Sequence, residues 1–168
     1  NYTWKQLAAS HENSFAIRSD GTLWGWGLAV GNRIGIGSGP VPERIMSPVQ
    51  IGSDTDWKKV VSGVAHSLAL KEDGTLWSWG HGYLSGFDIT RPVKISNAVN
   101  WKDILATDGT SWALKEDGSL WCWGNNHVGQ LGIGSAIPNE LNTIEQLSVD
   151  SDWEKLCSAS VYAFFCLA

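Results

Sequence analysis

The sequence predicts an all-β fold, a β-propeller built from four-stranded antiparallel blades. Two observations predict this architecture. A lone tryptophan recurs at intervals of 44 to 53 residues, at Trp4, Trp57, Trp101 and Trp153. After each of the first three of these tryptophans comes an Asp-Gly dipeptide, followed by the pattern Leu-Trp-x-Trp-Gly, which ends at Gly27, Gly80 and Gly124. Repeats of this length, built from short strands, indicate propeller blades, and about three and a half of them are present.

The repeats make residues 1–168 a single β-propeller segment, with units at 4–56, 57–100 and 101–152 and a partial unit at 153–168. We name the four strands expected in each unit A to D. Strand A follows the lone Trp, and an aliphatic residue stands three positions after it, at Leu7, Val60, Ile104 and Leu156. In strand B, large residues 11 and 13 positions after the lone Trp alternate with a small one, at Ala16, Ala69 and Ala113. This alternation is the two-residue period of a strand.

The Asp-Gly dipeptide between strands B and C predicts a tight hairpin. We expect a type I′ turn, which needs a positive φ at both central positions. The charged residues beside it, Lys71 with Glu72 and Lys115 with Glu116, are then expected to form solvated hairpin tips. In strand C, Trp-x-Trp places two indoles on one face, where they can fill the gap to a neighbouring sheet.

Strand D is expected at residues 48–51, 92–95 and 144–147, and two prolines in these runs, Pro48 and Pro92, suit an edge strand. The distance from the second Trp of strand C to this run is 22, 13 and 21 residues in the three complete units. The C–D loop is therefore the part that varies. Variable loops on a rigid scaffold are where recognition usually resides.

Two motifs carry a family resemblance. Residues 123–134, Trp-Gly-Asn-Asn-His-Val-Gly-Gln-Leu-Gly-Ile-Gly, and residues 60–70, Val-Val-Ser-Gly-Val-Ala-His-Ser-Leu-Ala-Leu, resemble the signatures of the regulator-of-chromosome-condensation repeat family. Val61 replaces the usual small residue, unit one keeps a degraded version at residues 31–39, and unit two lacks Gly-Gln-Leu-Gly. The resemblance covers essentially the whole chain and implies a seven-bladed propeller. WD-type and kelch blades fit less well, because the sequence has no Trp-Asp dipeptide and no Gly-Gly pair.

Three complete units and one partial unit do not make a closed ring of whole blades. Fourteen strands are expected, and two chains would supply enough for seven blades. An end-to-end joint, however, would leave strands C and D missing in two places. We therefore expect a fragment of a longer repeat protein, with an oligomer of unusual closure as the alternative. The chain begins at Asn1 and shows no signal peptide, which also fits an excerpt or a processed product.

Composition excludes several classes of partner. Lys and Arg number 12 against 17 Asp and Glu, a net charge of -5 without a basic stripe, so nucleic acid is not an expected partner. No apolar run approaches 18 residues, so no membrane span is expected. Cys122, Cys157 and Cys166 are too few for a disulfide framework, and we expect free, buried thiols. The compartment stays open, with a secreted or cell-surface bacterial setting slightly favoured over the cytoplasm.

The residue types that carry chemistry do not assemble into an expected catalytic, cofactor or metal site. The stretch from Gly31 to Gly39 lacks the Lys-Ser/Thr of a phosphate-binding loop, so we interpret it as a propeller loop that needs positive φ. His66 stands beside Ser67, but its repeat equivalents share only the capacity to hydrogen-bond: Asn13, Thr110 and Tyr162. We expect these four to bind backbone near the A–B turn. The remaining histidines and the strand cysteine show no ligand spacing: His11, His81, His127 and Cys122.

These observations favour a non-catalytic propeller module that binds another protein through the C–D loops at residues 28–47, 81–91 and 125–143. The candidate contact residues are Arg33, Glu43, Arg44, Tyr83, Phe87 and His127. On an alternative interpretation Tyr83 and Phe87 merely cover a blade edge. The family resemblance implies protein-binding platforms, including an exchange factor for a small GTPase and secreted inhibitors of β-lactamases, without matching contact positions here. Two other functions stay open: a structural building block that self-associates through open blade faces, and an enzyme with a central-tunnel site completed by missing blades.

Overall fold

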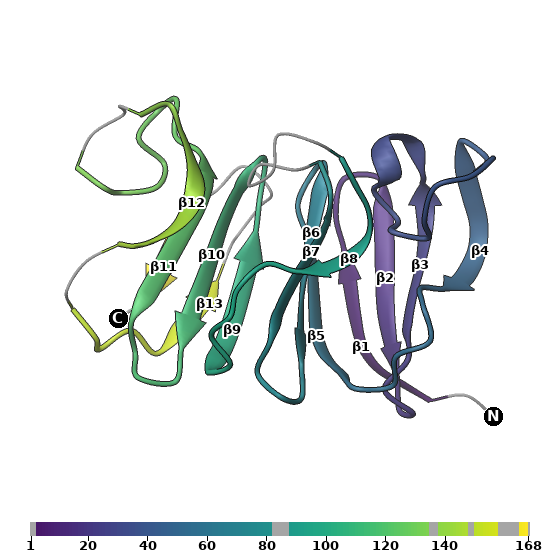
Figure 1. Cartoon of the computed structure of the whole chain (residues 1–168), viewed down its shortest axis with the longest axis horizontal. Helices are drawn as coiled ribbons and strands as arrows, with labels where there is room; N and C mark the ends of the chain where they lie inside the picture. Colours follow the sequence, from purple (N-terminus) through teal and green to yellow (C-terminus); the bar gives the residue numbers. More distant parts are fainter. Residues whose placement is uncertain (1–2, 82–87, 135–137, 148–149, 158–164, 168) are drawn as a thin grey trace.

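The computed structural model describes residues 3–81, 88–134, 138–147, 150–157 and 165–167. Within these residues the chain forms three four-stranded antiparallel sheets and one two-stranded pair. The sheets stand side by side in a row, in sequence order from the N-terminus to the C-terminus (Figure 1). This arrangement confirms the all-β class and the four-stranded blades. No helix among the described residues has the length and apolar character needed to cross a membrane.

Each sheet takes its strands in sequence order. Blade 1 comprises β1 (Trp4–Ala9), β2 (Asn13–Arg18), β3 (Leu23–Leu28) and β4 (Arg44–Gln50), with the short 3-10 turn η1 (Val30–Asn32) in its C–D loop. Blade 2 comprises β5 (Trp57–Ser62), β6 (His66–Lys71), β7 (Leu76–Gly80) and β8 (Ile89–Lys94). Blade 3 comprises β9 (Trp101–Ala106), β10 (Thr110–Lys115), β11 (Leu120–Asn125) and β12 (Glu140–Gln146). The two-stranded pair consists of β13 (Lys155–Cys157) and β14 (Phe165–Leu167).

The A strands form the inner edge of the row, because β1 contacts β5, β5 contacts β9 and β9 contacts β13. The D strands β4, β8 and β12 form the opposite edge of their sheets, as the prolines Pro48 and Pro92 indicated. The D strands begin three or four residues earlier than predicted, however. In β4 these early residues include the exposed Arg44 and Met46, with only Ile45 buried between them, so no run of alternating buried residues marks the start of the strand.

The core consists of layers between consecutive blades. In the first layer Phe15 and Ile17 of β2 pack with Val60, Ala69 and Trp79 of blade 2. Blade 2 presents its own large residues to blade 3 in the same way, because Leu68 and Leu70 share a cluster with Ile104, Ala113 and Trp123. Every blade thus has a face with large strand-B residues and a face with the small Ala and the second Trp. The predicted role of the Trp-x-Trp motif as a filler between sheets is confirmed for its second indole.

Polar side chains also join the A strands of neighbouring blades. The Gln6 amide donates to the Val60 carbonyl at 2.7 Å and accepts from the Val60 N–H at 2.8 Å. The residue at the corresponding position of blade 3, Asp103, accepts from the Leu156 N–H at 3.4 Å. In blade 2 that position is Lys59, which pairs with Asp103 instead. The position two residues after the lone Trp therefore links each blade to the next.

The Asp-Gly hairpins form as predicted, but the predicted turn type is wrong. Asn32 is the one non-glycine residue of the described chain with a positive φ, so Asp20 does not adopt the left-handed conformation that a type I′ turn needs. Instead the Gly21 N–H donates to the Arg18 carbonyl, and Gly21 alone has a positive φ, at 79°. This is a type I turn closed by a glycine bulge. A Cβ on Gly21 would also lie 1.9 Å from the Thr55 carbonyl oxygen of the linker to blade 2.

Candidate partner-binding surface

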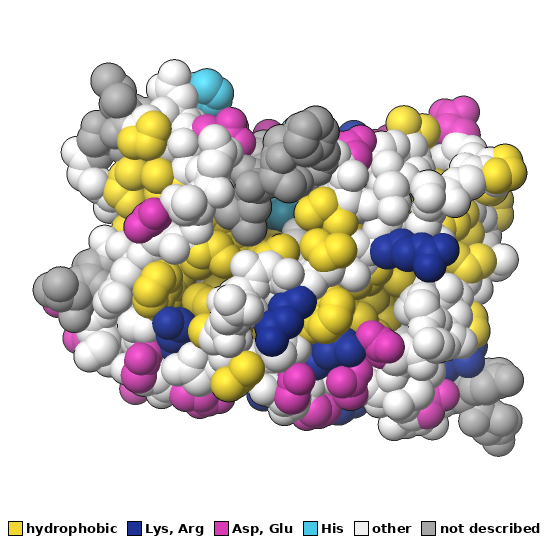
Figure 2. All heavy atoms as spheres, in the orientation of Figure 1, with side chains coloured by type: hydrophobic (Ala, Val, Ile, Leu, Met, Phe, Trp, Pro, Cys, Tyr) yellow, Lys and Arg dark blue, Asp and Glu magenta, His cyan; other side chains and the backbone are white. Residues whose placement is uncertain are grey.

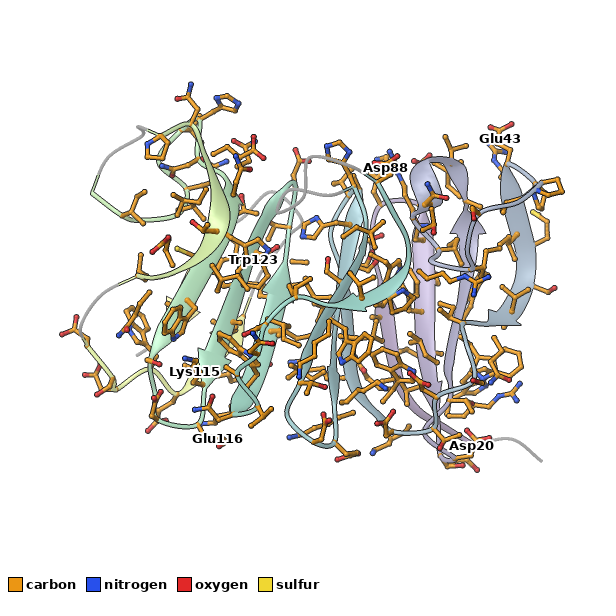
Figure 3. All side chains as sticks on the ribbon, in the orientation of Figure 1. Asp20, Glu43, Asp88, Lys115, Glu116 and Trp123 are labelled. Carbon is orange, nitrogen blue, oxygen red and sulfur yellow. The ribbon has the colours of Figure 1, made fainter. Side chains whose placement is uncertain are left out.

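The row of blades has two rims. The hairpin rim carries the Asp-Gly turns and the linkers between blades, and Asp20, Lys115 and Glu116 lie on it (Figure 3). The loop rim at the other end carries the A–B turns and the C–D loops, with Glu43 and Asp88 among its residues (Figure 3). Because the two rims differ in how far their sequence repeats, they differ in what they can do.

The hairpin rim repeats one internal stack in all three blades. In blade 2 the lone Trp57 meets Trp77 edge to face, with ring centroids 5.6 Å apart. The Lys71 ammonium lies over both rings, 4.9 and 4.5 Å from their centroids. The Trp77 indole N–H donates to the Thr75 hydroxyl, which donates in turn to Asp73 at 2.6 Å. Cation–π contacts of this kind stabilise most when they are shielded from water.

The equivalent stacks use a different cation or hydroxyl but the same geometry. Blade 1 has Arg18 over Trp4 and Trp24, and blade 3 has Lys115 over Trp101 and Trp121. The predicted solvated tip is therefore wrong for both lysines: Lys71 is buried and Lys115 half-buried, because each ammonium lies on indole faces.

Hydrogen bonding governs the ionisation of the hairpin rim. Bonds from the hydroxyl and N–H of Thr75 hold the pKa of the Asp73 carboxyl below its usual range, and the equivalent bonds do the same for Asp20 and Asp117. Burial opposes the charge of Lys71, yet its bonds to Asp54 and Asp56 raise the pKa of this ammonium above its ordinary value. Carboxylates line this rim in Figure 2, and those of the stacks are already bonded within the protein.

The loop rim instead changes from blade to blade. In blade 1 the C–D loop folds into η1 and places Arg33, which is half-buried, beside the A–B turn. The Arg33 guanidinium pairs with Glu12 at 3.3 Å, and its backbone carbonyl accepts from the Trp79 indole of blade 2 at 3.1 Å. Arg33 therefore anchors the loop to the next blade as well as facing the rim.

The other predicted contact residues are distributed along the same rim. Glu43 and Arg44 are exposed where the first C–D loop enters β4, and His127 is exposed in the third C–D loop. Hydrogen bonds inside the third C–D loop hold its backbone, since the Asn126 side chain accepts from the Leu131 N–H and donates to the Pro138 carbonyl. Tyr83 and Phe87 lie outside the described residues.

Two polar contacts on the loop rim were not predicted from the sequence. Glu12 of the A–B turn pairs with Arg33 and lies 3.8 Å from the His11 ring. In blade 2, His81 and Asp88 stand 3.1 Å apart at the two ends of the short C–D loop. A sequence signal existed for the contact between His81 and Asp88. The C–D loop is short in unit two, so its two ends, which carry this histidine and this acid, lie close together.

The polar residue nine positions after the lone Trp binds backbone as predicted in units one and three, whereas in unit two it contacts the next blade. Tyr162 of unit four lies outside the described residues. Asn13 and Thr110 bind the backbone carbonyls of Leu28 and Asn125, near the A–B turn. His66 instead has its Nε2 2.8 Å from the Ser111 hydroxyl oxygen of blade 3. Complete burial, with a smaller effect from His81, lowers the pKa of His66 to about 4. The imidazole is therefore a neutral link between blades at pH 7.

No cluster of three metal-ligating side chains occurs in the part of the chain that the structure describes. Cys122 is a buried, free thiol. Burial raises the pKa of the Cys122 thiol to about 12, so it is not a nucleophile at neutral pH. Cys157 is half-buried, whereas a buried thiol was predicted. It lies opposite Phe165, one position out of register with Cys166.

Comparison with known proteins identifies the repeat. Two family models, both described as the regulator of chromosome condensation (RCC1) repeat, together match residues 20–84 and 102–145. The chain belongs to the RCC1 repeat family. This membership agrees with the strand order of the blades and with the two motifs at residues 60–70 and 123–134.

The RCC1-repeat chain resembles several larger proteins. It is 33% identical over 79 residues to the ultraviolet-B receptor UVR8 of Arabidopsis thaliana, a match that covers 46% of this chain and 17% of the receptor. Among solved structures, Prp20p of Saccharomyces cerevisiae superposes with a TM-score of 0.76 at 21% identity, over 86% of this chain and 38% of Prp20p. Human WBSCR16 gives a TM-score of 0.78 at 20% identity, over 90% and 41% of the two chains. The chain thus spans about two fifths of the structures that share its fold.

Proposed function

We propose that this RCC1-repeat segment is a non-catalytic module that binds another protein through its loop rim. The observation that carries the proposal is the contrast between the rims. The hairpin rim repeats the same closed stack three times, whereas the loop rim differs in loop length, in ionic contacts and in exposed side chains. Divergence on a fixed scaffold is the pattern of a recognition surface.

Relatives support a protein partner. Prp20p has been characterised for its binding to Gsp1p and histones, and Kap60 has been solved bound to yeast RCC1 (Prp20). For the present chain these relatives support the class of function, protein binding, and leave the partner open.

The chemistry of the loop rim suits the polar periphery of a protein interface. Arg44 and Glu43 are exposed side by side, and His127 is exposed on the third loop. Arginine is among the residues enriched at interfaces, and surface charges mainly steer encounter and select partners. We therefore expect binding to depend on ionic strength.

The test compares two charge reversals of equal size. Arg44→Glu changes the loop rim, and Lys102→Glu is the matched control on β9, where the side chain is also exposed. Proteins crosslinked to each variant are quantified by mass spectrometry against the unchanged chain, and circular dichroism confirms the fold. Partners should be lost from Arg44→Glu and kept by Lys102→Glu. Identical partner sets for all three chains would refute recognition by this part of the loop rim.

A second candidate function, self-assembly, is favoured by one face of blade 1. Leu7 is 67% exposed, whereas the equivalent Val60, Ile104 and Leu156 are 0%, 1% and 6% exposed because each packs against the blade before it. Another blade stacked on this face, from a second copy, would bury Leu7 in the same way. Light scattering over a dilution series tests this. A discrete oligomer that Leu7→Asp dissociates supports it, and a monomer at every concentration refutes it.

A further inference from the structure

A hollow of about 270 Å³ lies between blades 1 and 2. Its apolar lining consists of Ile36, Ile51, Trp57 and Pro92, and its charged lining of Asp54 and Arg91. Hydrophobic side chains are visible in the recess between β8 and blade 1 (Figure 2). The volume falls just below the range of about 300–1,000 Å³ that is typical of small-molecule sites. A single inserted side chain suits it better than a free ligand.

The hollow depends on the path of the first C–D loop. The long C–D loop of blade 1 crosses to blade 2, where the Gly37 N–H donates to the Thr90 carbonyl at 2.8 Å. Gly35 and Gly37 permit this approach, with φ of +80° and +103°. A Cβ on them would lie 2.6 Å from the Trp79 ring and 2.4 Å from Arg91 Nε, respectively. The shorter C–D loop of unit two has eight or nine fewer residues with which to make such a crossing.

Arg91 departs from the repeat. In the sheet register Val93 lies opposite Ser78, just as Val49 lies opposite Gly25 and Glu145 opposite Cys122. Two positions earlier, the three D strands carry Arg91, Ser47 and Thr143. An arginine is thus present at this position only in the blade whose D strand borders the hollow.

The charges around the hollow leave Arg91 without a counter-charge. Asp54 shares the Lys71 ammonium with Asp56, at 2.7 and 3.0 Å. Arg91 is exposed, its guanidinium lies against Gly37, and no carboxylate among the described residues forms an ion pair with it. A guanidinium beside an apolar recess is complementary to a carboxylate that follows an apolar side chain.

We propose that the hollow is the anchor site for a partner peptide in which an aliphatic side chain enters the recess and the next residue's carboxylate pairs with Arg91. This inference rests on the proposed function, because it names the chemistry with which a protein partner engages the first C–D loop. The aliphatic group would lie on Ile36, Ile51 and Trp57, and the pairing with Arg91 would fix the direction of the peptide.

The test uses nuclear magnetic resonance of the isotope-labelled chain with blocked peptides as probes. The first probe is acetyl-Gly-Leu-Glu-Gly-amide, and its controls replace Leu by Ser or Glu by Gln. The Leu-Glu peptide should shift the Trp57 indole and Gly35 amide resonances, and both control peptides should shift them much less. Arg91→Gln should weaken binding about fivefold, the equivalent of about 1 kcal/mol, while Lys102→Gln, which also removes one exposed positive charge, should leave it unchanged.

Two results would overturn the anchor site: no shift of these resonances at millimolar Leu-Glu peptide, or equal shifts with the Ser and Gln controls. Its failure is distinguishable from failure of the proposed function. If crosslinked partners are lost from Arg44→Glu but kept by Arg91→Gln, the loop rim binds protein and the hollow is not its anchor. If the peptide binds at Arg91 while Arg44→Glu keeps every partner, the hollow stands and the wider rim fails.

Discussion

Replacing Trp79 by alanine tests the central structural claim, that the second Trp of each Trp-x-Trp motif wedges between blades. Trp79 is fully buried, and its ring meets Phe15 of blade 1 edge to face with centroids 5.5 Å apart. Its indole N–H also donates to the Arg33 carbonyl. Large-to-small substitution of a buried aromatic costs about 3–5 kcal/mol. Leaving the Arg33 carbonyl without its donor adds about 1 kcal/mol, so we expect a loss of unfolding free energy near the upper end of that range.

The assay is urea unfolding followed by circular dichroism, with Trp26→Ala as the matched control. Trp26 holds the same repeat position in blade 1, but it is only half-buried. We expect the loss of unfolding free energy in Trp26→Ala to be less than half that in Trp79→Ala, with unchanged slopes. A loss below about 1 kcal/mol for Trp79→Ala, or equal losses in the two variants, would refute the wedge.

Three further predictions concern contacts between and within blades. Gln6→Ala should lower the free energy of unfolding by about 1–2 kcal/mol in urea, because it removes both hydrogen bonds to Val60. The folded-state pKa of His66 is about 4, so the unfolded chain binds the proton at a higher pH than the folded chain. The contribution of neutral His66 to the free energy of unfolding should be complete above pH 6.5 and should fall by about 3 kcal/mol between pH 6.5 and 4. His66→Gln should flatten this slope in urea titrations carried out at several pH values. Cys122 should resist a thiol reagent in the folded chain and react in urea, and fast labelling of its tryptic peptide without urea would contradict the burial of its thiol.

The fold was largely predictable because the repeat records the packing of one blade on the next. The lone Trp, the small Ala and the second Trp of strand C recur because each lies in a layer between blades. The start of strand D could not be predicted in the same way. At the start of β4 only Ile45 is buried, between the exposed Arg44 and Met46, and a single buried position does not make a hydrophobic period.

The candidate site was less predictable, because its contacts join residues that the repeat does not relate. The offset of His66 indicated a polar residue, but its partner Ser111 belongs to the next blade, 45 residues away. Arg91 belongs to strand D of blade 2, yet its importance comes from a loop of blade 1 that lies against it. Such contacts follow from loop paths across blades, and loop paths carry no periodic signal.

The two rims lead to opposite expectations for evolution of binding on this scaffold. Lys71 on the hairpin rim is shared by two indoles and two carboxylates. A partner that drew this lysine away would leave Trp57 without its cation and Asp54 without its counter-charge, so binding there would compete with folding. Arg44 and Arg91 are exposed and belong to no stack, so their charges can change without loss of the blade. New partners should therefore be acquired through the loop rim and through the hollow at Arg91, and the stack around Lys71 should stay closed.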